Sequence, residues 1–308
     1  MNNTEDNNLN GKSTGARMNI KKRILGKTGE KVFPIGLGTG PLGNPNLLQR
    51  QIDSLVSDAI DLGVNLFDTA PSYGQSEERL GISLHSQRRE ILLSTKVGYG
   101  VEGISDWTYD SIIFGVEKAC KRLRTDYLGV VHLHSCPLST LKNFEVVEAL
   151  LKTKEQGKIR FTAYSGDNQE LQWAVSSGFF DVVQCSANIC DRYNQERILP
   201  VAKLQGLGVL AKRALANSVW MLKEQPAQND LAIYYQRFHN LNIDRIEAHE
   251  LAVRYITHHS LIDCALIGTT QLSHLQKNIE LFQKGPLAID QIRKIEQLTL
   301  DALGSGIV

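Results

Sequence analysis

The sequence predicts an α/β fold, a (β/α)8 TIM barrel with an N-terminal β-hairpin and a C-terminal extra helix. Eight short segments rich in Val, Ile and Leu alternate with longer segments whose apolar residues recur at helical spacing. The short segments show little alternation of apolar and polar residues, as is typical of parallel strands covered on both faces. Eight consecutive strand–helix units of this kind are the pattern of a closed parallel barrel.

The N-terminal part of the chain differs in composition from the rest. Residues 1–17 are rich in Asn, Gly, Ser and Thr and nearly lack apolar side chains, so we expect a disordered tail there and one barrel domain over residues 18–308. At the start of this domain, Arg23–Leu25 and Lys31–Phe33 flank the turn-forming residues 26–30. This pattern predicts a small hairpin.

The predicted strands are the eight apolar segments that follow this hairpin. They comprise Pro34–Gly38, Val64–Asp68, Ile91–Lys96, Leu128–His134, Ile159–Tyr164, Asp181–Cys185, Gly208–Ala211 and Asp263–Ile267. Helical patterns separate them at residues 52–60 and 112–123, and over Ser76–His85, Lys142–Glu155, Asn168–Ser177, Asn194–Leu204, Ile246–His258 and Leu272–Lys284. We expect the long segment Asn217–Asp244 to shape a pocket and Ile289–Leu303 to form the extra helix on the outside.

A doubly wound sheet is the structural alternative. It would carry a GxGxxG turn that opens a helix directly after the first strand. Here the glycines of residues 36–40 are followed by Pro41 and lack that context, so the barrel is favoured.

Composition and charge exclude several classes of partner. The 308 residues carry 34 basic and 33 acidic side chains, and a formal net charge of +1 gives no basis for binding nucleic acid. No segment is long and apolar enough to span a bilayer, so we expect no membrane partner. Five cysteines without a CxxC pair predict neither a disulfide framework nor a zinc site, and a reducing cytoplasm is the expected location.

Polar side chains stand where three neighbouring predicted strands end. Asp68, Lys96 and His134 end the second, third and fourth strands, and Tyr73 lies in the loop after Asp68. Because the chemistry of a TIM barrel sits at the C-terminal ends of its strands, we expect these four side chains to converge. Of the nearby pair His132 and His134, we expect only the second to point into the barrel, and the first to be structural.

These four residue types suit the reduction of a carbonyl group, which needs a hydride and a proton. A tyrosine can give the proton although its free pKa is about 10, because a nearby ammonium stabilises the phenolate. A carboxylate keeps the lysine charged, and a histidine can orient the carbonyl. The sequence therefore predicts Tyr73 as the proton donor. The structural alternatives are a helix cap for Asp68 and a turn aromatic for Tyr73.

Several segments of the chain resemble the aldo-keto reductases. They are residues 65–77 (NLFDTAPSYGQSE), 93–98 (LSTKVG), 126–134 (DYLGVVHLH), 157–160 (GKIR) and 267–270 (IGTT), together with Asn278. The resemblance extends from about residue 22 to residue 284 and places the family's catalytic tetrad on Asp68, Tyr73, Lys96 and His134. It also implies NADPH as cofactor, with NADH possible, a small carbonyl substrate and no metal.

The same resemblance implies a set of cofactor-binding residues. Ser165 and Gln184 would hold the nicotinamide carboxamide, and Gly38 and Thr39 would approach the cofactor from the end of the first strand. The remaining residues implied are Asp68, Lys212, Arg213, Leu215, Asn217, Gly268, Thr269, Thr270, His274 and Asn278.

The sequence departs from the family pattern at three places. Gly166 and Asp167 follow Ser165 where an Asn is usual, and Lys212 stands where a Tyr commonly stacks on the nicotinamide. The arginine often found near the 2′-phosphate is absent, with Thr270 and His274 nearby. We still expect NADPH, because Arg213 can supply positive charge.

Two other functions remain open at the level of sequence. His132-Leu133-His134 is similar to the metal-binding pair of barrel hydrolases, although no other predicted strand ends in His. A catalytically silent NADPH-binding regulatory subunit could share the same fold. Tyr99, Trp107 and Trp220 are candidates for the pocket wall, with loop packing as the alternative. The sequence predicts no particular oligomeric state.

Overall fold

The computed structural model describes residues 20–227 and 229–296 and confirms the predicted barrel. Within these residues, eight parallel strands close into a ring in the order β10-β3-β4-β5-β6-β7-β8-β9, with β10 also paired to β9. They are β3 (Ile35–Gly38), β4 (Leu66–Asp68), β5 (Leu92–Val97), β6 (Leu128–His134), β7 (Ile159–Ser165), β8 (Val182–Ser186), β9 (Gly208–Lys212) and β10 (Cys264–Gly268). Each predicted strand is confirmed to within two residues at either end.

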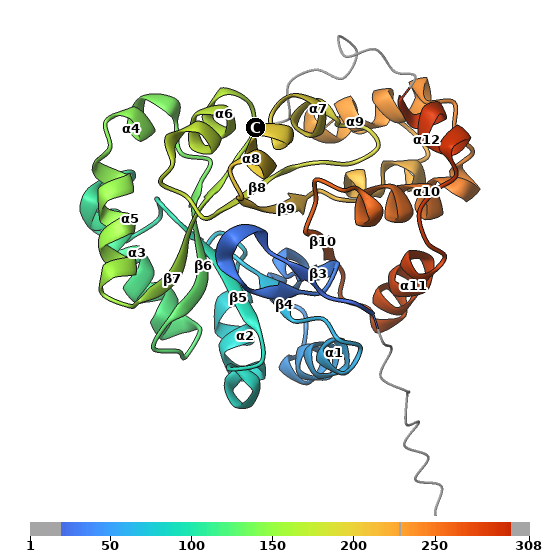
Figure 1. Cartoon of the computed structure of the whole chain (residues 1–308). Helices are drawn as coiled ribbons and strands as arrows, with labels where there is room; N and C mark the ends of the chain where they lie inside the picture. Colours follow the sequence, from blue (N-terminus) through green and yellow to red (C-terminus); the bar gives the residue numbers. More distant parts are fainter. Residues whose placement is uncertain (1–19, 228, 297–308) are drawn as a thin grey trace, which may run out of the picture.

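Helices surround the strands (Figure 1). One follows each barrel strand in the expected place: α1 (Gln49–Asp61), α2 (Ser76–Ser83), α3 (Tyr109–Arg122), α5 (Glu145–Glu155), α6 (Asn168–Ser177), α8 (Leu199–Leu204), α10 (Arg245–His258) and α11 (Leu272–Gln283). The described part of the chain adds α4 (Leu138–Lys142), α7 (Tyr193–Arg197), α9 (Asn229–Asn240) and α12 (Ile289–Glu296). Their apolar sides form the main core against the outer faces of the strands.

Two predicted helices are each divided in the structure. The pattern over Lys142–Glu155 begins at the end of α4, and Phe144, in the left-handed backbone region with φ of 69°, separates α4 from α5. The pattern over Asn194–Leu204 is divided between α7 and α8, because Pro200 in the first turn of α8 has no N–H to continue the earlier helix. The predicted extra helix begins at Ile289 as α12, and its residues 297–303, like the predicted tail 1–17, lie outside the described residues.

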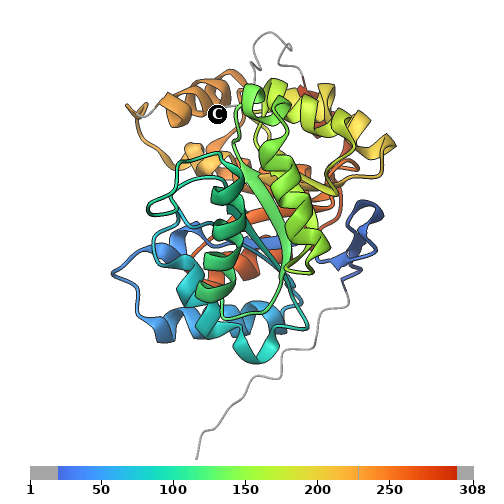
Figure 2. The same ribbon diagram turned by 90° about the vertical axis from the view of Figure 1, so that its left-hand side faces the viewer.

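The expected hairpin closes the N-terminal end of the barrel. Strands β1 (Arg23–Ile24) and β2 (Lys31–Val32) pair antiparallel across a short 3-10 helix at Gly26–Thr28, and they stand at one side of the molecule in Figure 2. Leu25 and Val32 are buried together with the side chains that fill the N-terminal part of the barrel interior. The backbone N–H of Lys27 donates to Gly206 O at 2.7 Å. With this end filled, the barrel interior opens toward the C-terminal ends of the strands.

A second apolar cluster lies beside the barrel mouth. Trp220, Tyr234 and Phe238 pack there against α10 and against Ile295 of α12. The segment Asn217–Asp244, expected to shape a pocket, begins inside a 3-10 helix (Ala216–Met221) and includes α9. Side chains of both helices belong to this cluster.

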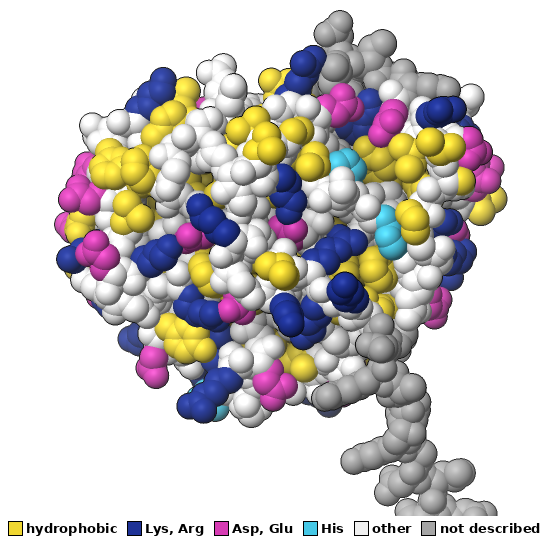
Figure 3. All heavy atoms as spheres, in the orientation of Figure 1, with side chains coloured by type: hydrophobic (Ala, Val, Ile, Leu, Met, Phe, Trp, Pro, Cys, Tyr) yellow, Lys and Arg dark blue, Asp and Glu magenta, His cyan; other side chains and the backbone are white. Residues whose placement is uncertain are grey.

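On the face shown in Figure 3, Lys and Arg side chains are interspersed with acidic, apolar and uncharged ones. In the part of the chain that the structure describes, no helix is long and apolar enough to cross a membrane. All five cysteines are free, and four of them are buried. The location of the protein in a reducing cytoplasm stays a prediction.

Gly81 of α2 lies close to the C-terminal end of α3. A Cβ at residue 81 would stand 2.3 Å from the carbonyl oxygen of Arg122. Helix propensity alone favours Gly81→Ala by about 1 kcal/mol, whereas overpacking against backbone costs about 2 kcal/mol or more. We therefore expect Gly81→Ala to lower the free energy of unfolding in a urea titration. The control Ile82→Ala, at a side chain 41% exposed, should stay within about 0.5 kcal/mol of the parent protein. A gain in stability for Gly81→Ala would contradict this packing.

Candidate active site

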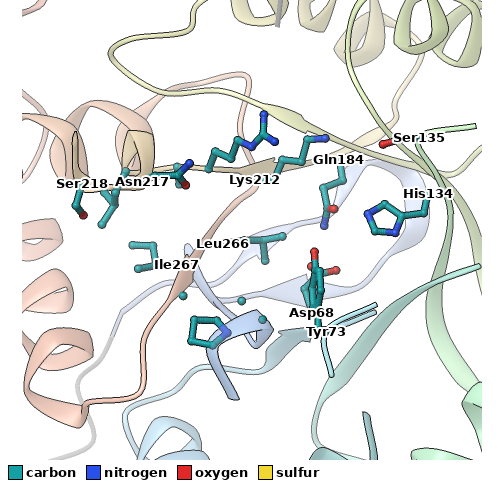
Figure 4. A pocket seen from close by; sticks show the side chains of 17 residues that line it. Asp68, Tyr73, His134, Ser135, Gln184, Lys212, Asn217, Ser218, Leu266 and Ile267 are labelled. Carbon is teal, nitrogen blue, oxygen red and sulfur yellow. The ribbon is translucent and has the colours of Figure 1, made fainter. Parts of the chain in front are cut away.

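A cavity of about 650 Å³ opens at the C-terminal ends of the strands. This volume is in the range of small-molecule sites, roughly 300–1,000 Å³. Figure 4 shows Asp68 and Tyr73 together on one side, with Gln184 and His134 directed toward them and Lys212 nearby. The lining residues are Gly38, Gly40, Pro41, Asp68, Tyr73, His134, Ser135, Gln184, Lys212, Arg213, Ala214, Leu215, Asn217, Ser218, Leu266, Ile267 and Gly268.

A buried ion pair lies beside this cavity. Lys96, near the end of β5, places Nζ 2.7 Å from Oδ2 of Asp68 at the end of β4, and the two side chains are only 1% and 6% exposed. The Lys96 ammonium also donates to Thr69 O at 2.8 Å, and Ser94 Oγ donates to the other carboxylate oxygen at 2.7 Å. Each charge thus has close partners, which a buried ion requires.

The pair holds both groups in their charged forms. Burial acts to raise the pKa of Asp68, but the Lys96 charge and the hydrogen bonds from Lys96 and Ser94 outweigh it, so the pKa of Asp68 is lowered. Burial acts to lower the pKa of Lys96, but attraction to Asp68 reverses the sign and raises it. An ammonium is therefore fixed beneath the cavity at neutral pH.

Tyr73 lies directly above this ammonium. Lys96 Nζ is 5.0 Å from the centre of the Tyr73 ring, and the Tyr73 and His134 rings meet edge to face with centroids 6.4 Å apart. Gly43 packs closely against the loop that carries Tyr73. A Cβ at residue 43 would come within 1.7 Å of the Tyr73 carbonyl oxygen, so this approach requires a glycine. The structure thus brings together Asp68, Tyr73, Lys96 and His134, the four side chains that the sequence predicted to converge.

His132 and His134 both face the barrel interior, so the prediction that only one does so is wrong. His132 Nε2 lies 3.0 Å from Ser94 Oγ, which itself bonds Asp68, and His134 lines the cavity one layer higher. The physical reason is the strand period of two, which puts residues i and i+2 on the same face. The same period of two, counted back from Lys96, places Ser94 on the interior face of β5. The sequence analysis missed this residue.

Both histidines are held neutral. Burial, followed by repulsion from Lys96 and Lys212, lowers the pKa of His134 to about 3. Burial likewise lowers the pKa of His132 to about 3, against the opposing attraction of Asp68. The His134 ring can therefore act at the cavity only as a neutral hydrogen-bonding group near pH 7.

Gln184 presents an unused hydrogen-bond donor at the cavity. Its Oε1 accepts from Ser165 Oγ at 2.8 Å, and its Nε2 is buried without a hydrogen-bond partner in the described part of the protein. A buried donor of this kind is costly unless a ligand pairs with it. The carboxamide oxygen of a nicotinamide fits that requirement, so these residues suit such a cofactor.

Lys212 does not stand free at the cavity wall. Its Nζ lies 3.1 Å from Oδ2 of Asp167, a fully buried carboxylate that also accepts from the backbone N–H of Ser186 at 2.7 Å and from Asn194 Nδ2 at 2.8 Å. The Lys212–Asp167 pair was missed at the sequence level. One signal in the sequence could have found it. Both positions depart from the family pattern: Lys212 stands where a Tyr is common, and Asp167 adjoins the position where an Asn is usual.

The segment after β9 bends sharply around the cavity mouth. Arg213, Ala216, Asn217 and Ser218 all have positive φ, between 45° and 55°, and Asn188 Nδ2 donates to Arg213 O at 3.0 Å. Such a run of non-glycine residues is strained and needs outside support.

The expected cofactor-binding residues fall into two groups. Gly38, Asp68, Gln184, Lys212, Arg213, Leu215, Asn217 and Gly268 line the cavity, whereas Thr39, Ser165, Thr269, Thr270, His274 and Asn278 are not among its lining residues. Thr39 is buried and donates to Asp68 O, and buried Asn278 bonds His249 Nε2 through Oδ1 at 2.7 Å. His274 and Thr270 are exposed beside Thr269 at the start of α11. Their cofactor contacts stay predictions.

The three aromatic candidates for the pocket wall differ in outcome. Trp220 is 2% exposed within the second apolar cluster, so it is loop packing. Tyr99 and Trp107 are not among the residues that line the cavity. Their rings pack edge to face with centroids 5.8 Å apart, and Tyr99 contacts the lining residue His134.

In the described residues, no group of three or more His, Cys, Asp and Glu side chains is arranged to hold a metal ion. The hydrolase alternative rested on His132 and His134, and His132 Nε2 lies within hydrogen-bond distance of Ser94 Oγ. His132 is thus engaged with the Ser94–Asp68 hydrogen bond, and the geometry does not support the hydrolase alternative.

The chain belongs to the aldo/keto reductase family, whose sequence profile matches residues 34–299. It is similar to L-galactose dehydrogenase of Arabidopsis thaliana, at 29% identity over 287 residues that cover 84% of this chain and 87% of that protein. It is also similar to NADH-specific methylglyoxal reductase of Escherichia coli, at 29% identity, covering 62% of this chain and 66% of that protein.

A solved aldo-keto reductase from Bacillus halodurans shares the fold, with a TM-score of 0.78 and 24% identity over 92% of this chain and 100% of that chain. The resemblance found in the sequence is thereby confirmed. The protein is an oxidoreductase of a family that uses nicotinamide cofactors.

The neutral state of His134 has a consequence for stability. Its pKa is about 3 in the folded protein against an ordinary value of 6.5, so the unfolded chain binds a proton first as the pH falls below 6.5. The contribution of His134 to stability is thus complete above pH 6.5 and is lost progressively toward pH 3. Between pH 7 and pH 5, we expect the parent protein to lose about 2 kcal/mol more unfolding free energy than His134→Gln. Urea titrations at the two pH values measure this.

The control for this comparison is His85→Gln, at an exposed histidine that does not line the cavity. It should show the same pH dependence as the parent protein. An equal loss for the parent protein and for His134→Gln would contradict a buried, neutral His134.

Proposed function

We propose that this protein reduces a small aldehyde or ketone to an alcohol with NAD(P)H, and that Tyr73 gives the proton. The observation that carries the proposal is the buried Lys96–Asp68 pair, with Nζ and Oδ2 2.7 Å apart, directly beneath the Tyr73 ring. A phenol set against a permanent ammonium at the wall of a ligand-sized cavity is arranged to release a proton.

Each of the four side chains has a distinct role in this proposal. Tyr73 protonates the carbonyl oxygen, and Lys96 stabilises the phenolate left behind. Asp68 keeps Lys96 charged and directs its Nζ toward Tyr73. Neutral His134 donates a hydrogen bond to the same oxygen and so orients the carbonyl.

The nicotinamide would lie between the Tyr73 side of the cavity and Gln184, where it supplies the hydride. Gln184 Nε2 would bind the carboxamide oxygen, which would satisfy a donor that is otherwise buried and unpaired. The alkyl stem of Lys212, held by Asp167, would cover one face of the ring in place of an aromatic side chain.

For the cofactor we propose NADPH, with NADH as the second candidate. Arg213 supports NADPH because it brings a guanidinium to the cavity wall, where a phosphate would be attracted. Two observations favour NADH: Asp230 lies 3.6 Å from Arg213 and offsets part of this charge, and one relative is named as NADH-specific. Steady-state rates with each cofactor decide between them.

The substrate class proposed is a small carbonyl compound, with aromatic or apolar aldehydes and sugars as candidates. The mixed polar and apolar lining of the cavity admits both kinds. One relative is named for a sugar, L-galactose, and another for a small aldehyde, methylglyoxal. A panel of such carbonyls, with the corresponding alcohols for the reverse direction, is the assay to use.

Tyr73→Phe removes the proposed proton donor and keeps the ring that packs on Lys96 and His134. We expect kcat with NADPH and an aldehyde such as 4-nitrobenzaldehyde to fall roughly 10²–10⁴-fold, the usual size of general acid catalysis. Cofactor affinity, measured by fluorescence titration, should change little.

The matched control is Tyr127→Phe, because the half-buried Tyr127 ring packs against Arg88 and does not line the cavity. It should keep the parent kcat. A near-normal kcat in Tyr73→Phe would show that another group gives the proton. Tight NADPH binding by the parent protein without consumption of any carbonyl in the panel would instead indicate a silent regulatory subunit.

A further inference from the structure

Besides Tyr73, His134 meets a second phenol, that of Tyr99. Tyr99 Oη lies 2.6 Å from His134 Nδ1, and the two rings stack with centroids 5.4 Å apart and planes inclined by 24°. Among the described residues no hydrogen bond reaches His134 Nε2, the other ring nitrogen. One nitrogen of the imidazole is thus committed to Tyr99 and the other remains available.

The direction of the Tyr99–His134 hydrogen bond follows from what else the phenol can reach. If Nδ1 carried the proton, the Tyr99 hydroxyl would have to accept it and send its own hydrogen elsewhere. Its other neighbour is Ser72 Oγ at 3.4 Å, beyond the roughly 2.5–3.0 Å of an O–H···O bond. Donation from Tyr99 to Nδ1 places the phenolic hydrogen in the short contact and leaves Nε2 as the ring nitrogen without a hydrogen-bond partner among the described residues.

Tyr99 is itself held rigidly. The backbone N–H of Trp107 donates to Gly98 O at 2.7 Å, and the Trp107 ring packs edge to face on Tyr99. Gly98 has φ of +135°, a conformation that suits glycine, and a Cβ there would stand 2.1 Å from the Trp107 ring. The loop after β5 thus fixes the phenol in position against the histidine.

We propose that Tyr99 is a positioning residue that fixes His134 in the tautomer with its proton on Nε2. In a neutral imidazole, the hydrogen bond made by one nitrogen decides which nitrogen carries the proton. With Tyr99 donating to Nδ1, the Nε2–H is the donor that remains for a carbonyl oxygen. This role rests on the proposed function, in which His134 orients the carbonyl.

The first test measures the tautomer in the full chain without substrate. In nitrogen NMR of protein labelled at histidine, the eight histidines give separate N–H-type and acceptor-type nitrogen signals. The signals of His134 are identified by their loss in His134→Gln. We expect an acceptor-type Nδ1 and a protonated Nε2 in the parent protein, and loss of this fixed assignment in Tyr99→Phe. A protonated Nδ1 in the parent protein, or an unchanged tautomer in Tyr99→Phe, would overturn the proposal.

The second test asks whether the His134 tautomer controls turnover. Tyr99→Phe keeps the ring stack and should lower kcat roughly tenfold or more, the effect of one hydrogen bond on an acting group, with KM for the cofactor unchanged. Tyr127→Phe, the matched control, should leave both kcat and the His134 signals as in the parent protein. An unchanged kcat in Tyr99→Phe, or a loss of kcat without a change of tautomer, would contradict the role.

The two levels of proposal fail in different ways. If Tyr73→Phe abolishes turnover while Tyr99→Phe retains both kcat and tautomer, only the Tyr99 role is wrong. If the parent protein reduces no carbonyl, the proposed function is wrong, and the NMR spectrum still decides whether Tyr99 fixes the tautomer. If Tyr99→Phe does not fold, the tautomer of the parent protein alone decides.

Discussion

The buried ion pair between Lys96 and Asp68 is the interaction on which the site depends. Two charges that are 1% and 6% exposed are stable only with close partners, and removing one leaves the other uncompensated at a cost of about 3–5 kcal/mol. The pair therefore ties the ends of β4 and β5 together and at the same time fixes a positive charge under Tyr73. The same charge helps to keep His134 neutral.

The barrel provides the geometry that this pair requires. Its N-terminal end is filled by apolar side chains and the hairpin, so polar groups gather at the other end, where the strands open to the cavity. Each side chain of the site is then held by a second one: Lys212 by Asp167, Gln184 by Ser165, and His134 by Tyr99. Such supporting contacts hold the groups that face a ligand in place.

Much of the fold was predictable because buried parallel strands consist of short segments rich in Val, Ile and Leu. The four convergent side chains were predictable because the active site of a TIM barrel lies at the C-terminal ends of its strands. Helix divisions at Phe144 and Pro200 depend on local backbone geometry that apolar periodicity does not carry. His132 was misplaced because the strand period was misapplied. The Tyr99–His134 and Lys212–Asp167 contacts each join a loop residue to the last residue of a strand that does not precede that loop, and only the folded chain brings the two together.

The most direct test of the account is the double variant Asp68→Asn/Lys96→Met, which removes both charges and leaves no buried ion unpaired. It should retain a cooperative unfolding transition, because replacing both partners avoids most of the cost of breaking the pair. We expect its kcat for carbonyl reduction to fall about 10²-fold or more while the cofactor still binds. A folded double variant with kcat close to that of the parent protein would show that the buried charge beneath Tyr73 does not drive the reaction.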